Sequence, residues 1–139
     1  TGDAGEPIRG EGRILVLDDE ERIRQLVGDL LSHLGYDWEC VADGHEALHA
    51  YRRARNEGRA FDVVIMDLTV PGGMGGQEAA ARILELDPEA RTIVCSGYSD
   101  DPIMAQFRDY GFRGVVAKPY DIAELSRVLA QVMGTSNDA

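Results

Sequence analysis

Polar side chains follow four of the apolar runs in this sequence, each at the point where the run ends. Asp18 and Asp19 follow the first run and Asp67 follows the third. Ser96 follows the fourth and Lys118 the fifth. If these runs are parallel strands of one sheet, their carboxyl ends share one edge, which is where ligands bind in open α/β sheets. We therefore expect three carboxylates, one hydroxyl and one ammonium group to converge at that edge.

Such a cluster suits metal-assisted phosphoryl chemistry. Crowded carboxylates repel one another, and the repulsion grows as water is excluded. Lys118 offsets one unit of charge, and Mg²⁺ held by a few carboxylates and water offsets more. One oxygen of Asp67 then remains available to attack phosphorus and form an acyl phosphate. Mg²⁺, Lys118 and Ser96 would each meet one phosphoryl oxygen as charge develops there.

Each of these residues also has a simpler structural interpretation. An acidic pair after a strand often caps the next helix, so Asp18 and Asp19 alone decide nothing. A single serine is usually structural, and a single lysine is usually a solvated surface residue. The chemical interpretation is favoured because all of these residues stand at strand ends, in an order that brings them together.

Alternating strand and helix patterns position the candidate residues. Apolar runs predict strands at 13–17, 38–41, 61–66, 92–95 and 114–117. Helical spacing predicts helices over 23–34, after Asp43, after a Gly-rich loop at 71–76, from 101 to a stop at Gly111, and after Asp121. Strands that are nearly all apolar, separated by helices, predict a parallel sheet covered on both faces. The fold class is therefore α/β and doubly wound, with right-handed crossovers.

Four short motifs resemble the receiver domain of bacterial two-component response regulators. They are Leu-Asp-Asp-Glu at 17–20, Met-Asp-Leu-Thr-Val-Pro-Gly at 66–72, Ser-Gly at 96–97 and Lys-Pro-Tyr at 118–120. The resemblance extends over 13–133. It implies a flavodoxin-like (βα)5 fold with a five-stranded parallel sheet in the order 2-1-3-4-5.

The resemblance also implies roles for individual residues. Asp67 would take a phosphoryl group from a phosphohistidine on a histidine kinase or phosphotransfer domain. Asp19 and Asp67 would bind Mg²⁺ directly, Asp18 would act through water, and the backbone carbonyl of Thr69 would be a further ligand. Such a domain catalyses its own phosphotransfer and dephosphorylation, so it is an enzyme only in a loose sense.

Signalling from the site would depend on residues near the last strands. Lys118 would pair with the phosphoryl group, and Ser96 would move to bond it, switching the surface of the fourth helix, fifth strand and fifth helix. The family commonly has an aromatic residue three positions before the lysine, where this chain has Val115. Either Tyr98 takes over part of this coupling or the coupling is weak.

The Gly-rich loop and the Ser-Gly-Tyr-Ser sequence at 96–99 are similar to receivers fused behind hybrid sensor histidine kinases. We expect residues 1–12 to be a linker or chain end, 13–133 the receiver domain and 134–139 a flexible tail. A fused kinase core would make the parent chain a protein-histidine kinase. A free-standing regulator is the alternative.

Two other functions compete with an active phosphoacceptor. A degenerate receiver would act as a docking scaffold, but Asp19, Asp67, Ser96 and Lys118 are all present. An Mg²⁺-dependent phosphohydrolase on a similar fold usually has its nucleophile after the first strand, with a second Asp two residues later. Here Asp18 is adjacent to Asp19.

His45-Glu46-x-x-His49 matches the zinc metalloprotease pattern on an expected helix. Catalytic zinc needs a third protein ligand, and the remaining histidine, His33, lies at the far end of the preceding helix. We therefore expect a solvated helix face there.

Composition limits the partners. The 139 residues fit one domain, and a net charge of −11 argues against binding nucleic acid directly. Cys40 and Cys95 lie in apolar runs and are expected to be reduced, as in the cytoplasm. No apolar run approaches the roughly 18 residues of a membrane span, so we expect no membrane contact by this domain.

Overall fold

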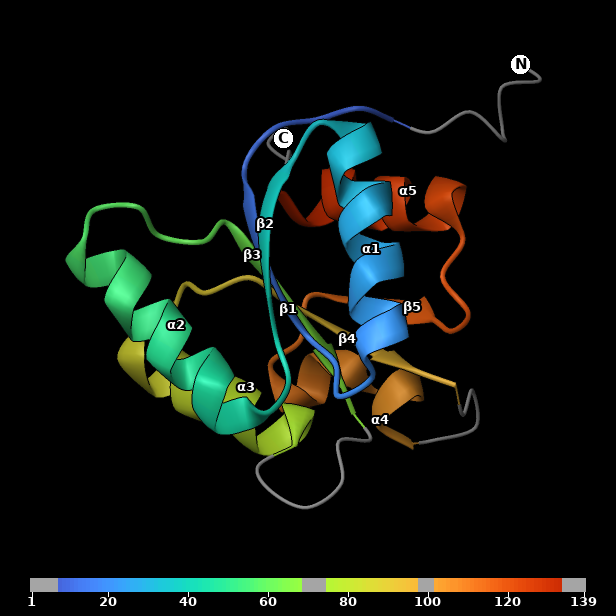
Figure 1. Cartoon of the computed structure of the whole chain (residues 1–139). Coiled ribbons are helices and arrows are strands. Elements are labelled where there is room, and N and C mark those ends of the chain that lie inside the picture. Colours follow the sequence, from blue (N-terminus) through green and yellow to red (C-terminus); the bar gives the residue numbers. More distant parts are fainter. Residues whose placement is uncertain (1–7, 69–74, 98–101, 134–139) are drawn as a thin grey trace.

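A computed structural model describes residues 8–68, 75–97 and 102–133, which form one five-stranded parallel sheet with helices on both faces (Figure 1). The strands are β1 (Arg13–Leu17), β2 (Asp37–Val41), β3 (Val63–Asp67), β4 (Thr92–Ser96) and β5 (Gly114–Ala117). The helices are α1 (Glu21–Leu34), α2 (Gly44–Asn56), α3 (Gly76–Leu86), α4 (Pro102–Ala105) and α5 (Ile122–Met133), with a 3₁₀-helix η2 (Phe107–Tyr110). The strand order is β2-β1-β3-β4-β5, so the predicted flavodoxin-like fold is confirmed.

Each face of the sheet has its own apolar core. Helices α2 and α3 cover one face, and α1 and α5 cover the other (Figure 1). Successive side chains of a strand point to opposite faces, so Leu15 and Leu17 pack under α2 and α3 whereas Ile14 and Val16 pack under α1 and α5. This double burial explains why the inner strands β1, β3 and β4 are nearly all apolar, whereas edge strand β2 is mostly exposed or half-buried.

Helix boundaries follow local backbone chemistry. Gly35 ends α1 with φ of 103°, a left-handed conformation that glycine adopts without penalty. Asp43 caps α2 by accepting from the backbone N–H of Glu46 at 2.9 Å. Asp121 caps α5 in the same way, accepting from the N–H of Glu124 at 2.9 Å. All three boundaries agree with the sequence-based expectation.

Two predicted elements differ from the structure. The third strand begins at Val63, two residues later than expected, because Asp62 accepts from the N–H of Arg13 through its side chain at 2.8 Å. The single helix expected over 101–111 is instead a four-residue α4 followed by η2, and Asp101 lies outside the described residues. Gln106 between them has non-helical angles, φ −119° and ψ 40°.

The break near Gln106 lets the chain turn quickly into β5. Thr92 Oγ1 donates to the carbonyl of Gly111 at 3.1 Å, and Phe112 is buried with 2% exposed. These contacts with β4 and the core fix the end of the segment more tightly than a continuous helix would allow. Tertiary packing therefore overrides the helical spacing.

The segment before β1 contacts the domain where it is described. The N–H of Ile8 donates to Ser126 Oγ at 3.0 Å, and the N–H of Gly10 donates to the Leu34 carbonyl at 2.9 Å. Cys40 and Cys95 are both free thiols, as expected. Among the described residues, no helix is long and apolar enough to cross a membrane.

Candidate functional site

The predicted site residues meet at the carboxyl edge of the sheet, at the lower ends of β1 and β3 in Figure 1. Asp18 directly follows β1, Asp67 ends β3, Ser96 ends β4 and Lys118 directly follows β5. Asp18, Asp67 and Ser96 are buried, with at most 1% exposed, whereas Asp19 is exposed. The N–H of Lys118 donates to the Ser96 carbonyl at 3.0 Å, which holds the ends of β4 and β5 in register.

Lys118 joins the two buried carboxylates. Its Nζ lies 2.8 Å from Asp18 Oδ2 and 2.9 Å from Asp67 Oδ2, and 17% of its side chain is exposed. Burial acts to lower the pKa of this amine, but the hydrogen bonds to Asp18 and Asp67 outweigh it and hold the pKa above its usual value. The group is therefore a permanent cation at neutral pH. Lys118 is also the only lysine in the sequence.

Three carboxylates at this edge can share one cation. One oxygen each of Asp18, Asp19 and Asp67 lies within 4.8 Å of the others. Carboxylate oxygens are the hard donors that Mg²⁺ prefers, and a site with few carboxylates leaves room for its water ligands. The donor set therefore fits Mg²⁺. The further ligand expected at Thr69 lies outside the described residues.

The turn between β1 and α1 is held in part by Arg24, a residue that the sequence did not single out. Asp18 Oδ1 accepts from the N–H of Glu20 at 2.9 Å, and the Asp18 carbonyl accepts from Nη1 of Arg24 at 2.8 Å. Nothing in the sequence separates Arg24 from Arg22 two positions earlier. Only the rotation of the finished helix turns one of them toward the site.

A glycine makes room for the backbone of Asp67. A Cβ atom on Gly76 would lie 2.4 Å from the Asp67 carbonyl oxygen, closer than atoms can approach without a shift. Gly76 is the first residue of α3, so this close approach sets the distance between α3 and the end of β3.

Cys95 and Tyr120 contact each other close to the site residues Ser96 and Lys118. The Tyr120 hydroxyl lies 2.9 Å from Cys95 Sγ, and burial raises the pKa of Cys95 to about 12. Burial also raises the pKa of Tyr120, so both groups stay protonated at neutral pH. Tyr120 packs against the core under α1 and α5. Tyr120 therefore makes the contacts of a core residue. Tyr110, at the end of η2, is exposed.

The predicted switch residues are only partly described. Val115 is half-buried and packs against the core under α2 and α3. Tyr98, which we considered as its substitute, lies outside the described residues.

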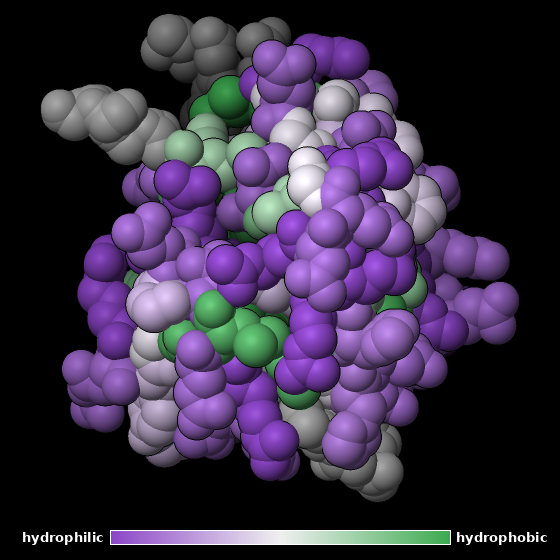
Figure 2. Space-filling view, turned by 90° about the vertical axis from the view of Figure 1, so that its left-hand side faces the viewer, coloured by the Kyte–Doolittle hydropathy of each residue, from purple (hydrophilic) through white to green (hydrophobic). Residues whose placement is uncertain are grey.

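The His-Glu-x-x-His sequence lies on the outer face of α2. This side of the molecule is mostly hydrophilic, with a small hydrophobic patch near its centre (Figure 2). His45 and His49 are exposed there, and they line an open cavity of about 470 Å³. Glu46 instead completes the α2 cap, accepting from the N–H of Ala42 at 2.8 Å. Within the described ranges, only Asp18, Asp19 and Asp67 form a group of three or more potential metal ligands.

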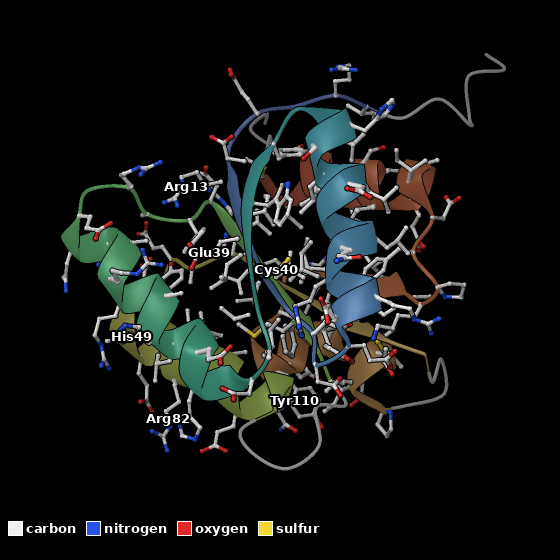
Figure 3. The ribbon with its side chains drawn as sticks, viewed as in Figure 1. Arg13, Glu39, Cys40, His49, Arg82 and Tyr110 are labelled. Carbon is white, nitrogen blue, oxygen red and sulfur yellow. The ribbon has the colours of Figure 1, made fainter. Side chains whose placement is uncertain are left out.

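β2 is an edge strand of the sheet, and its side chains point alternately toward α2 and toward α1. Figure 3 shows Glu39 on the side of β2 that faces α2 and Cys40 on the side that faces α1. Glu39 pairs with Arg53 of α2 at 2.8 Å. The Cys40 thiol contacts the Arg24 carbonyl at 3.6 Å, and burial raises its pKa to about 11. The Glu39–Arg53 pair is partly solvated, so it contributes little to stability.

Sequence comparisons place this geometry among known proteins. Residues 14–130 match the family profile of the response regulator receiver domain. The chain is 29% identical to the chemotaxis protein CheY of Thermotoga maritima, covering 86% of this chain and 96% of that protein. It is 30% identical to sporulation initiation phosphotransferase F of Bacillus subtilis, covering 81% of this chain and 86% of that protein.

A solved structure gives a similar result. The receiver domain of sensor histidine kinase PA1611 from Pseudomonas aeruginosa superposes with a TM-score of 0.78 at 25% identity, covering 91% of this chain and all of that one. That structure has a magnesium ion coordinated in its active site cleft. This chain therefore shares its fold with a receiver domain whose solved structure holds magnesium.

Proposed function

This chain belongs to the response regulator receiver domain family and is a phosphoacceptor of two-component signalling, and we propose that Asp67 is the residue that receives the phosphoryl group. The observation that carries this proposal is the pair of contacts from Lys118, at 2.8 Å to Asp18 and 2.9 Å to Asp67. They concentrate one fixed cation and two buried carboxylates at a strand end, where negative charge would otherwise be unstable.

The chemistry follows from the side chains. A carboxylate oxygen of Asp67 would attack phosphorus of a phosphohistidine, forming an O–P bond as the N–P bond breaks. The departing imidazole keeps the electron pair and takes a proton from solvent. Lys118 would hold its ammonium group against the phosphoryl oxygens, because its raised pKa keeps it charged throughout. Water would later cleave the acyl phosphate and regenerate Asp67.

Asp18, Asp19 and Asp67 would hold one Mg²⁺ ion. When bound, the ion supplies positive charge to the phosphoryl oxygens and lowers the repulsion between those oxygens and the carboxylates. Support comes from the three carboxylate oxygens within 4.8 Å of one another and from the magnesium ion in the related receiver of PA1611. Asp19, the most exposed of the three, would complete the site from the solvent side.

Ser96 would report phosphorylation to the rest of the domain. It is buried at the end of β4, and its carbonyl already accepts from the N–H of Lys118. A phosphoryl group on Asp67 would draw the Ser96 hydroxyl toward it and bias the adjoining surface of α4, β5 and α5. Val115 stands where the family commonly has an aromatic residue, so either Tyr98 would take over part of this coupling or the coupling would be weak.

Receiver domains of this family interact with histidine kinases or phosphotransfer proteins, and we propose such a donor for this chain. A parent chain with a fused kinase core is one form of this proposal, supported by the likeness to the receiver of a sensor histidine kinase. We assign the receiver to 13–133, and we propose a cytoplasmic location.

Intact-protein mass spectrometry tests the acceptor. Wild type, Asp67→Asn and Asp29→Asn would be incubated with acetyl phosphate or phosphoramidate, with and without Mg²⁺. We expect wild type and Asp29→Asn, a matched change on the exposed face of α1, to gain one phosphoryl group only with Mg²⁺. Asp67→Asn should gain none. A modification that survives in Asp67→Asn would contradict the assignment.

The same samples separate the competing functions. A docking scaffold would remain unmodified with either donor and with a panel of phosphorylated histidine kinases. A phosphohydrolase would release phosphate from p-nitrophenyl phosphate at many turnovers without a stable adduct. A receiver should instead form a hydroxylamine-sensitive adduct that decays on a single-turnover timescale.

A further inference from the structure

Arg24 reaches from α1 back to the acidic edge of the sheet. It lies one turn into the helix, is half-buried, and donates from Nη1 to the carbonyl oxygen of Asp18 at 2.8 Å. We infer that Arg24 is a positioning residue that fixes the peptide between Asp18 and Asp19 and so orients the Asp19 carboxylate for Mg²⁺. This inference rests on the metal site proposed above.

Besides Arg24, the Asp18 side chain restrains the turn that carries the two carboxylates, since Asp18 Oδ1 accepts from the N–H of Glu20 at 2.9 Å. The N–H of Asp18 donates to the Val41 carbonyl at 3.1 Å, so the backbone is held on the strand side. On the helix side Glu20 occupies the N-cap position of α1, but its side chain makes no cap hydrogen bond. The Asp18 carbonyl lies between these two points, and the guanidinium of Arg24 is what holds it.

Fixing this carbonyl matters most for Asp19. A peptide group is planar, so the Asp18 carbonyl and the Asp19 N–H rotate together. Asp19 is exposed, and its carboxylate position follows from that rotation. Residues that orient metal ligands without touching the metal typically change metal affinity about 10- to 100-fold when mutated. We expect the lower end here, because Asp18 and Asp67 stay fixed by Lys118.

An electrostatic role for Arg24 predicts the opposite sign. Among the described residues, no carboxylate lies within ion-pair distance of its guanidinium, so the group is not neutralised by a direct partner. If Arg24 acted only as a nearby positive charge, it would repel Mg²⁺, and its removal would tighten binding. If it positions the ligands, its removal weakens binding. The direction of the change therefore separates the two roles.

Isothermal titration calorimetry with MgCl₂ provides the test. Arg24→Met keeps the aliphatic stem and removes the donor, whereas Arg24→Lys keeps a donor. Arg22→Met is the matched control, because it removes the same charge from an exposed position of the same helix. We expect the dissociation constant to rise about 10-fold in Arg24→Met, to recover partly in Arg24→Lys, and to stay unchanged or fall slightly in Arg22→Met.

A structural readout accompanies the affinity. The amide resonance of Asp19 in metal-free protein should shift or broaden in Arg24→Met and stay in place in Arg22→Met. Equal or tighter binding by Arg24→Met, with Asp67→Asn binding weakly, would overturn this inference alone. Absence of Mg²⁺ binding by wild type would overturn both the proposed metal site and the inference. If Arg24→Met is unfolded, Arg24→Lys decides. A dissociation constant above that of wild type, with a shifted Asp19 amide, is then expected, and binding equal to or tighter than wild type with an unshifted amide would overturn the inference.

Discussion

Replacing Lys118 with methionine should destabilise the metal-free domain strongly. The substitution keeps a flexible apolar stem but leaves the buried carboxylates of Asp18 and Asp67, at most 1% exposed, without their cation. At an effective dielectric constant of about 20, unit charges 2.8 Å apart attract by about 6 kcal/mol. Burying the three ions cancels much of this attraction, and removing one partner of a buried pair typically costs about 3–5 kcal/mol.

We expect a loss of about 3 kcal/mol in the free energy of unfolding, at the lower end of that range, because 17% of the Lys118 side chain reaches solvent. The pH dependence has a definite sign. A lysine whose pKa is raised in the folded state contributes its full stability below the unfolded value of about 10.4 and loses it as pH rises through the folded value. The difference in the free energy of unfolding between wild type and Lys118→Met should therefore stay constant from pH 7 to pH 9, because the Lys118 amine does not titrate in that range.

Magnesium should reduce the loss of unfolding free energy in Lys118→Met. The ammonium group and Mg²⁺ compete for the same carboxylates, so Lys118→Met should bind Mg²⁺ more tightly than wild type. A free Mg²⁺ concentration 100 times the dissociation constant stabilises a protein by about 2.7 kcal/mol. In a titration at fixed free Mg²⁺, the variant should gain more stability than wild type. Its phosphorylation rate should nevertheless fall, because the cation that meets the phosphoryl group is lost.

Urea denaturation followed by circular dichroism measures these differences, at zero and saturating Mg²⁺. Arg127→Met is the control, since it removes the same unit of charge from an exposed position on α5. A deficit below about 1 kcal/mol, the value typical of exposed pairs, would refute the buried-charge reasoning. A deficit that Mg²⁺ leaves unchanged would show that the ammonium and the metal do not share the carboxylates.

Gly76→Ala should lower the free energy of unfolding by about 1–3 kcal/mol and slow phosphorylation, because the new Cβ would lie 2.4 Å from the Asp67 carbonyl oxygen. Urea unfolding measures the loss, and Gly97→Ala is the control because a Cβ there would meet open space. Tyr51→Phe should cost about 1 kcal/mol at pH 7 by removing the 2.8 Å hydrogen bond to Asp87. That bond holds the pKa of Asp87 below its usual value, so its contribution is present above about pH 4 and is lost as pH falls through the folded pKa. In thermal unfolding, the extra stability of wild type over Tyr51→Phe should be smaller at pH 3 than at pH 7. A larger difference at pH 3 would contradict a stabilising hydrogen bond from Tyr51 to ionised Asp87.

Much of the fold could be predicted because its elements carry local signals. Gly35, Asp43 and Asp121 mark helix boundaries through their own backbone and side-chain chemistry, and each lies where the sequence indicated. The segment after Pro102 was predicted wrongly for the opposite reason. Its helical spacing is real, but contacts with Thr92 and the core break the helix at Gln106.

The candidate site was predictable to a similar extent. Strand ends and fold class together imply that Asp18, Asp67 and Lys118 meet, because parallel strands place their carboxyl ends at one edge. The supporting residues were not predictable. Arg24 looks no different in sequence from Arg22, and a tyrosine two residues after Lys118 gives no hint of a thiol partner.

The sequence by itself determined which side chains stand at the ends of the strands, because local apolar runs set the extent of each strand, whereas the strand order was implied only by the resemblance to receiver domains. Tertiary structure alone decided how those side chains pair. Lys118 and Asp67 are 51 residues apart, and their 2.9 Å contact depends on the summed geometry of two strands and the helices between them. Distances of this kind arise only when packing fixes the twist of the sheet and the rotation of each helix, which no local pattern encodes.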